Sequence, residues 1–180
     1  GIECLINQWA KIAEDYLDIN AIRGLLMAPK STINPMEELY CKLKEGEVFK
    51  QSTIAIVQDK AFHFKYPETK ECLEALGVNI LNWNLINDSP IPKDAKALII
   101  PGGFPEEFAE EISQCKNSLN SIRNFYCKKP LYAECGGMLI LGNSLTNKSG
   151  KSFKMSGLLP FHAQEGPLNI GYRKLKVISN

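Results

Sequence analysis

The sequence predicts an α/β fold, a doubly wound and mostly parallel sheet with helices on both faces. Short apolar runs rich in β-branched residues alternate with helical patterns from about residue 52 onward. These runs are continuous rather than alternating with polar residues, which is typical of strands buried on both faces. Glycine pairs closely follow two of the runs, as expected for tight turns at the edge of a sheet.

The first residues have a separate helical pattern. Residues 2–17 place apolar side chains at helical spacing, Asp18 can cap a second short helix, and Pro29 ends that helix. A polar stretch follows, with Pro35 and Gly46. We therefore expect three parts, with these bounds: a helical segment at 1–30, a linker at 31–51 and the main domain at 52–180.

The main domain is expected to alternate strands with helices. Pro67 begins a helix that runs through Leu76, and Gly77 suits its C-cap. Asn117 is expected to cap a later helix. The predicted strands are 53–57, 78–83, 97–100, 130–134, 157–161 and 172–178, and the other predicted helices are 106–115, 118–127 and one that begins at residue 135.

Composition excludes several classes of function. The chain has 180 residues, 44% hydrophobic and 23% charged, with a net charge of +1, so we expect no nucleic-acid partner. No apolar stretch is long enough to span a bilayer and no signal peptide is recognisable, so we expect no membrane partner and a cytoplasmic location. The chain begins with Gly1 rather than Met, which we interpret as the sign of a fragment or a processed product. Association with copies of itself is left open.

The six cysteines do not form a metal site in the sequence. No CxxC pair occurs and both histidines lie far from any cysteine, so no metal is expected and the thiols are expected to be reduced. Five of them lie in helical or linker patterns and are interpreted as structural. They are Cys4, Cys41, Cys72, Cys115 and Cys127.

Cys135 is the exception, because it follows a strand directly in LYAECGGM (131–138). A strand, a nucleophile and two glycines that lead into a helix have the layout of a nucleophile elbow with Cys in place of Ser. Such a turn places sulfur at the carboxyl edge of the sheet and at a helix N-terminus, which favours the thiolate. The N–H of Gly136 would face a developing oxyanion. The alternative is a buried structural thiol.

A second glycine turn lies in IIPGGFPEE (99–107). The N–H of Gly102 or Gly103 can complete an oxyanion hole, and the sequence does not choose between them. Glu106 and Glu107 stand in a first helical turn and are interpreted as structural, with Glu106 also a candidate for contacting a substrate. Glu134 points to the other side of its strand and is expected to orient the elbow.

The segment NKSGKS (147–152) only resembles the end of a phosphate-binding loop. Leu145 occupies the position where such a loop needs its first glycine, and no strand runs directly into the segment. We interpret it as a surface turn, and we expect no ATP site in this chain.

Six runs make the chain similar to the C-terminal half of cobyrinic acid a,c-diamide synthases. Residues 1–30 resemble the helical end of that family's N-terminal, nucleotide-binding half. AECGG and DKAFHF are the most specific segments. The runs are IAIVQDKAFHFKYPE (54–68), ECLEALGVNIL (71–81), LIIPGGFPEEFAEEI (98–112), KPLYAECGGMLILG (129–142), MSGLLPF (155–161) and IGYRKL (170–175).

The resemblance implies a flavodoxin-like class I glutamine amidotransferase fold and a mechanism. Cys135 would attack the side-chain amide of glutamine and form a glutamyl thioester, with Gly136 and Gly102 or Gly103 as the oxyanion hole. Ammonia would pass to an acetate side chain of cobyrinic acid or a related tetrapyrrole. ATP and Mg²⁺ would bind only in the N-terminal half, so no cofactor is expected in this chain.

The chain also departs from the family. The family's catalytic histidine lies in a GHEFHYS-like segment beyond the GYR strand, and the sequence stops at Asn180 before that segment. His63 and His162 stand at other positions and do not match it. We therefore expect a fold truncated at its C-terminus and slow glutamine hydrolysis by the chain alone.

Two other functions fit the same residues. One keeps the Cys135 elbow but amidates a different acceptor, such as another tetrapyrrole or a cell-wall precursor. The other is a non-catalytic module of the same fold in which Cys135 is a redox-sensitive thiol.

Overall fold

The structure is a computed structural model that describes residues 2–26, 37–38, 41, 52–166 and 174. The chain divides into two compact units, Gly1–Leu39 and Tyr40–Asn180. The predicted linker lies outside the described residues apart from 37–38 and 41, so the predicted domain boundaries stay predictions. Among the described helices, none is both long and apolar enough to cross a membrane.

The first unit contains the two predicted helices, α1 (Ile2–Tyr16) and α2 (Ile19–Leu25). Asp18 caps α2, because its carboxylate accepts a hydrogen bond from the N–H of Ala21 at 2.9 Å. The apolar side chains of α1 are exposed in this unit, Trp9 to 66%.

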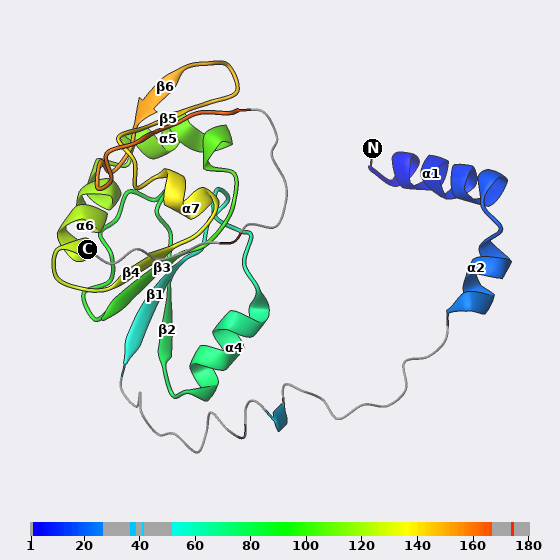
Figure 1. Ribbon diagram of the computed structural model, residues 1–180, viewed down its shortest axis with the longest axis horizontal. Helices are drawn as coiled ribbons and strands as arrows, with labels where there is room; N and C mark the ends of the chain where they lie inside the picture. Colours follow the sequence, from blue (N-terminus) through cyan, green and yellow to red (C-terminus); the bar gives the residue numbers. More distant parts are fainter. Residues whose placement is uncertain (1, 27–36, 39–40, 42–51, 167–173, 175–180) are drawn as a thin grey trace. The chain divides into compact units, whose positions relative to one another are not determined.

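The second unit is built on a four-stranded sheet in the order β2-β1-β3-β4, with all pairs parallel (Figure 1). This order is that of a flavodoxin-like doubly wound sheet, as predicted. The strands occupy the predicted positions with small changes at their ends. They are β1 (Thr53–Val57), β2 (Asn79–Trp83), β3 (Ala97–Ile100) and β4 (Leu131–Ala133).

Helices cover both faces of this sheet. On one face, Leu98 and Ile100 pack in a buried core with Ile112 and Ile122 of the helices α5 (Ala109–Gln114) and α6 (Lys116–Tyr126). The other face has α4 (Pro67–Ala75), which packs against β2. Each crossover therefore returns the chain to the same edge of the sheet, where the turns after β3 and β4 meet.

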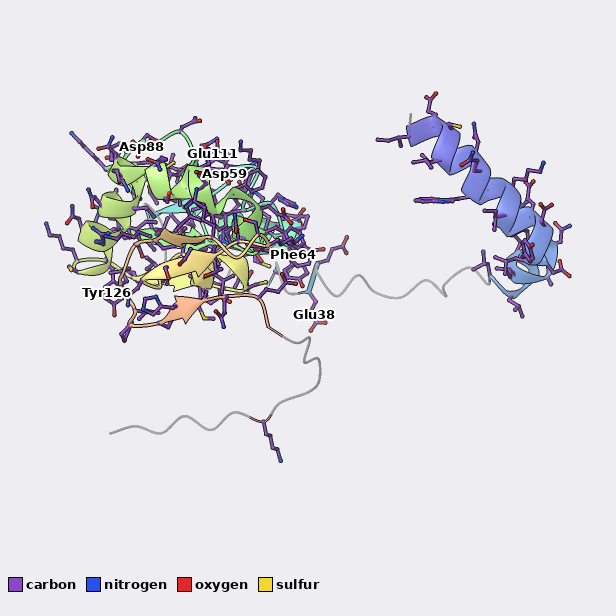
Figure 2. All side chains as sticks on the ribbon, turned by 90° about the horizontal axis from the view of Figure 1, so that it is seen from above. Glu38, Asp59, Phe64, Asp88, Glu111 and Tyr126 are labelled. Carbon is purple, nitrogen blue, oxygen red and sulfur yellow. The ribbon has the colours of Figure 1, made fainter. Side chains whose placement is uncertain are left out.

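Asp59 ties the loop after β1 to the loop after β2. Its carboxylate accepts hydrogen bonds from the N–H groups of Ala61 and Phe62 at 3.0 and 3.1 Å and from those of Leu85 and Ile86 at 3.0 and 3.4 Å. Asp59 and Asp88 lie toward the same side of this unit (Figure 2). The loop that carries the DKAFHF segment is thereby held to the loop after β2.

The helix predictions need correction at two places. The segment predicted as a helix at 106–115 begins as a 3-10 turn, η1 (Pro105–Phe108), before α5. Asn117 does not cap α6. The carboxylate of Asp88, from the loop after β2, instead accepts hydrogen bonds from the N–H groups of Asn117 and Ser118 at 2.7 and 3.1 Å.

The strand predicted at 157–161 is wrong. Gly157 has a φ of +66°, and the N–H groups of Ser156, Gly157 and Leu159 bond to carbonyls of residues 140–142, so the segment packs against the turn that follows the short helix after β4 and does not pair as a strand. A three-stranded sheet in the order β6-β5-β7 lies beside it, formed by β5 (Ser144–Thr146), β6 (Ser152–Lys154) and β7 (His162–Ala163). Of the strand predicted at 172–178, only Lys174 is described.

We predict that Asp59→Ala lowers the free energy of unfolding by about 2–4 kcal/mol, because four backbone donors lose a charged acceptor. Urea unfolding followed by the fluorescence of the buried Trp83 measures the change. Asp94→Ala, at an exposed aspartate, is the matched control and should stay within about 0.5 kcal/mol of the wild type. Equal effects of the two substitutions would contradict this role of Asp59.

Candidate active site

Cys135 stands at a strained turn between β4 and the short helix α7 (Gly136–Leu139). Its φ of +49° and ψ of −123° lie in a region that side-chain-bearing residues rarely adopt, at a cost of about 1–3 kcal/mol. Two hydrogen bonds hold the turn, from the N–H of Gly137 to the carbonyl of Glu134 at 2.8 Å and from the N–H of Met138 to the carbonyl of Cys135 at 3.1 Å. This is the backbone of a nucleophile elbow.

The two glycines after Cys135 are required by close backbone contacts. A Cβ on Gly136 would lie 2.4 Å from the carbonyl oxygen of Gly103, and a Cβ on Gly137 would lie 2.3 Å from the carbonyl oxygen of Ile100. Both distances are shorter than any real carbon–oxygen contact, so no side chain fits at either position. The helix that begins at residue 136 is therefore pressed against the turn after β3.

That turn contains Gly102 and Gly103, as predicted. Because β3 and β4 are adjacent parallel strands, their turns lie side by side, and a Cβ on Gly102 would lie 3.5 Å from the Cβ of Cys135. Gly102 forms an antiparallel bridge with Phe64 and accepts a hydrogen bond from its N–H at 3.1 Å. A Cβ on Gly103 would lie 1.9 Å from the carbonyl oxygen of Ala61. The loop after β1 therefore supports the glycine turn.

Cys135 opens into a cavity of about 490 Å³. The thiol is exposed, which excludes the alternative of a buried structural cysteine. Gly103 and Gly136 line the same cavity, whereas Gly102 does not. None of the described hydrogen bonds uses the N–H of Gly103 or Gly136 as a donor. Two backbone donors therefore remain available beside the sulfur.

Charged residues also line this cavity. Glu106, Lys148 and Glu165 line it, together with Gln164. Lys148 forms an ion pair with Glu107, and the hydrogen bond to Glu107 is the main cause that raises the pKa of the lysine ammonium, with smaller effects from the charges of Glu107, Glu165 and Glu106.

Sequence reasoning missed Lys148, Gln164 and Glu165 as members of the site. Lys148 lies in NKSGKS, which is a hairpin turn between β5 and β6, as expected for a surface turn. The turn is closed by Asn147, whose side-chain oxygen accepts hydrogen bonds from the N–H groups of Ser149 and Lys151. No local signal indicates that this hairpin folds back over Cys135.

Neither histidine lines the Cys135 cavity. His63 lies against Phe104, with 5.8 Å between ring centroids, and lines a cavity on the α4 face of the sheet. His162 contacts Ser144 and lines a separate cavity. Glu134 also lies outside the Cys135 cavity. Its carboxylate accepts a hydrogen bond from the hydroxyl of Tyr132 at 3.0 Å, which raises the pKa of the tyrosine.

Comparisons with known proteins agree with the resemblance stated from the sequence. A cobyrinate a,c-diamide synthase from Synechocystis sp. is 32% identical over an alignment of 181 residues that covers 99% of this chain and 37% of that protein. Another from Fusobacterium nucleatum is 42% identical over an alignment of 151 residues that covers 80% of this chain and 33% of that protein. The chain thus spans about a third of the length of these relatives. The crystal structure of a peptidase from an acI-B1 Actinobacterium matches with a TM-score of 0.45 at 16% identity, and the match covers 70% of this chain and 60% of that chain.

The family match begins at β1 and includes both glycine turns, the elbow and the second sheet. It extends over residues 53–169. This chain belongs to the CobB/CobQ-like glutamine amidotransferase domain family.

Proposed function

We propose that this chain is the glutamine-hydrolysing part of an ATP-dependent amidoligase that amidates the a and c acetate side chains of cobyrinic acid or a related tetrapyrrole. The reaction type is supported by the strained Cys135 elbow, which opens into a cavity beside two unused backbone N–H groups. The acceptor is suggested by the relatives, which are named cobyrinate a,c-diamide synthases.

The proposed chemistry begins with the Cys135 thiolate. Sulfur attacks the side-chain amide carbon of glutamine, and the N–H groups of Gly136 and Gly103 stabilise the oxyanion that forms. The C–N bond then breaks, the nitrogen takes a proton and ammonia leaves. Water hydrolyses the remaining glutamyl thioester to glutamate and restores the thiol. The proton donor and acceptor is proposed to be neither His63 nor His162, since both line other cavities.

Gly103 is preferred to Gly102 as the second donor, because Gly103 lines the cavity with Cys135 and Gly102 does not. Glu106 is proposed to bind the α-ammonium group of glutamine, because this residue lines the same cavity and a carboxylate can pair with an ammonium group.

The NKSGKS segment does not have the context of a phosphate loop. A phosphate loop joins a strand to a helix, whereas this segment joins two antiparallel strands. We therefore propose that the acceptor carboxylate is activated in a part of the protein outside the described residues.

We predict that 6-diazo-5-oxo-norleucine, a glutamine analogue with an electrophilic carbon, modifies Cys135 selectively in the complete enzyme. The strained turn exposes this sulfur beside the oxyanion donors, so labelling should be prevented by glutamine and abolished by Cys135→Ser. Peptide mass spectrometry identifies the modified residue. Cys127→Ser, at another exposed cysteine, is the control and should leave labelling unchanged. Oxidation of Cys135 by peroxide without any protection by glutamine would instead favour the redox-sensing alternative.

We predict that Gly136→Ala lowers kcat/KM for glutamine hydrolysis by about a hundredfold or more. The new Cβ collides with the carbonyl oxygen of Gly103 and displaces the proposed oxyanion donor. Gly24→Ala, where a Cβ meets nothing within 4 Å, should leave the rate unchanged. Circular dichroism separates this loss from unfolding, and a folded Gly136→Ala enzyme with the wild-type rate would refute the proposed oxyanion hole.

We predict that Glu106→Gln raises KM for glutamine by about tenfold and changes kcat little, because one charge-assisted contact to the substrate is weakened. Glu110→Gln is the matched control, since Glu110 pairs with Lys151 and does not line the cavity. Steady-state kinetics distinguish the two variants. An unchanged KM in Glu106→Gln would exclude the contact.

A further inference from the structure

A second cavity, of about 430 Å³, lies between α6 and the β6-β5-β7 sheet. Lys154, Ser144 and His162 occupy one register row across the three strands and line this cavity. Their neighbours Leu145 and Ala163 line the Cys135 cavity instead. Because side chains alternate between the faces of a strand, Ser144 and His162 line a different cavity from Leu145 and Ala163.

The second cavity is rich in positive charge. Lys116 and Arg123 of α6 line it opposite Lys154, and no Asp or Glu is among the residues that line it. Lys116 donates to the carbonyl of Ser113 at 2.6 Å. Arg123 donates to the carbonyl of Ser156 and to the side-chain oxygen of Asn120. These partners are neutral, so they fix the cations without balancing their charge.

Four other lysines in this unit are balanced by carboxylates, in the ion pairs Lys60–Glu111, Lys70–Glu74, Lys148–Glu107 and Lys151–Glu110. By contrast, Lys154 makes none of the described hydrogen bonds or ion pairs. Like charges held around one cavity repel each other unless an anion enters it.

Ser144 and His162 add directed donors to this charge. The hydroxyl oxygen of Ser144 lies 2.8 Å from Nδ1 of His162. When Ser144 donates to Nδ1, the ring proton lies on Nε2, which is then a donor for a ligand. Asn120 of α6, whose side chain carries an amide, also lines the cavity. Donors from α6 and from the row of Lys154, Ser144 and His162 therefore line the same cavity.

We propose that this cavity binds an oxyanion that carries at least two negative charges, as carboxylate or phosphate groups. Arg and Lys recognise both groups by charge-assisted hydrogen bonds. The donors come from two sides of the cavity, which suits a ligand with more than one acceptor oxygen. The site is distinct from the Cys135 cavity, because the two cavities share no lining residue.

Chemical-shift titration of the complete chain tests the proposal near neutral pH, with inorganic phosphate in one series and tricarballylate, a tricarboxylate, in the other. At least one anion should bind saturably and shift the amide signals of Ser144, Lys154 and His162. Tighter binding of phosphate assigns the site to phosphate groups, and tighter binding of tricarballylate assigns it to carboxylate groups. Saturable binding of neither anion would overturn the proposal.

Substitutions test whether the anion binds in this cavity. Lys154→Met and Ser144→Ala should each raise the Kd of the anion by about three- to tenfold. Lys154→Met removes one charged donor, and Ser144→Ala removes the hydroxyl that contacts Nδ1 of His162. Lys70→Met removes the same charge from an ion pair elsewhere and should leave Kd unchanged. Equal weakening by Lys70→Met and Lys154→Met would mean that net charge alone attracts the anion, which would refute a built site. Circular dichroism confirms that each variant is folded.

Discussion

Close contact between two backbone turns is the constraint on which the rest of the site depends. The carbonyl oxygens of Gly103 and Ile100 occupy the space that side chains would need at residues 136 and 137. The chain can enter α7 only through a compressed turn, and Cys135 takes up a φ of +49° at that turn. The strain is local, but the contacts that maintain it come from the parallel pairing of β3 and β4 and from the loop after β1.

The same architecture explains how one small unit holds two differently charged cavities. The β6-β5-β7 sheet presents Leu145 and Ala163 to the Cys135 cavity and Ser144 and His162 to the other. Glutamates and one lysine surround the first, whereas only cations and neutral groups line the second. A zwitterionic amino acid suits the first arrangement and a multiply charged anion suits the second.

Much of the fold could be predicted because its strands carry strong local signals. The run 97–100 forms a strand of the parallel sheet, and its four apolar residues are enough to predict that strand. Cys135 and the two glycines after it are likewise a local motif. The remaining features depend on distant contacts. Asp88 caps α6 from 29 residues away, and Lys148 reaches the Cys135 cavity only because a hairpin folds back over it. The prediction of a strand at 157–161 was wrong because Gly157 has a positive φ and the segment forms hydrogen bonds to residues 140–142 in place of strand pairing.

The central claim is that Cys135 accepts an acyl group from glutamine. Rapid acid quenching of the complete enzyme during glutamine turnover, followed by intact-protein and peptide mass spectrometry, measures this directly. The account predicts a glutamyl adduct on Cys135 that hydroxylamine removes, as expected for a thioester, and that is absent in Cys135→Ser. Glutamine hydrolysis that persists in Cys135→Ser, or an adduct on a different residue, would contradict it.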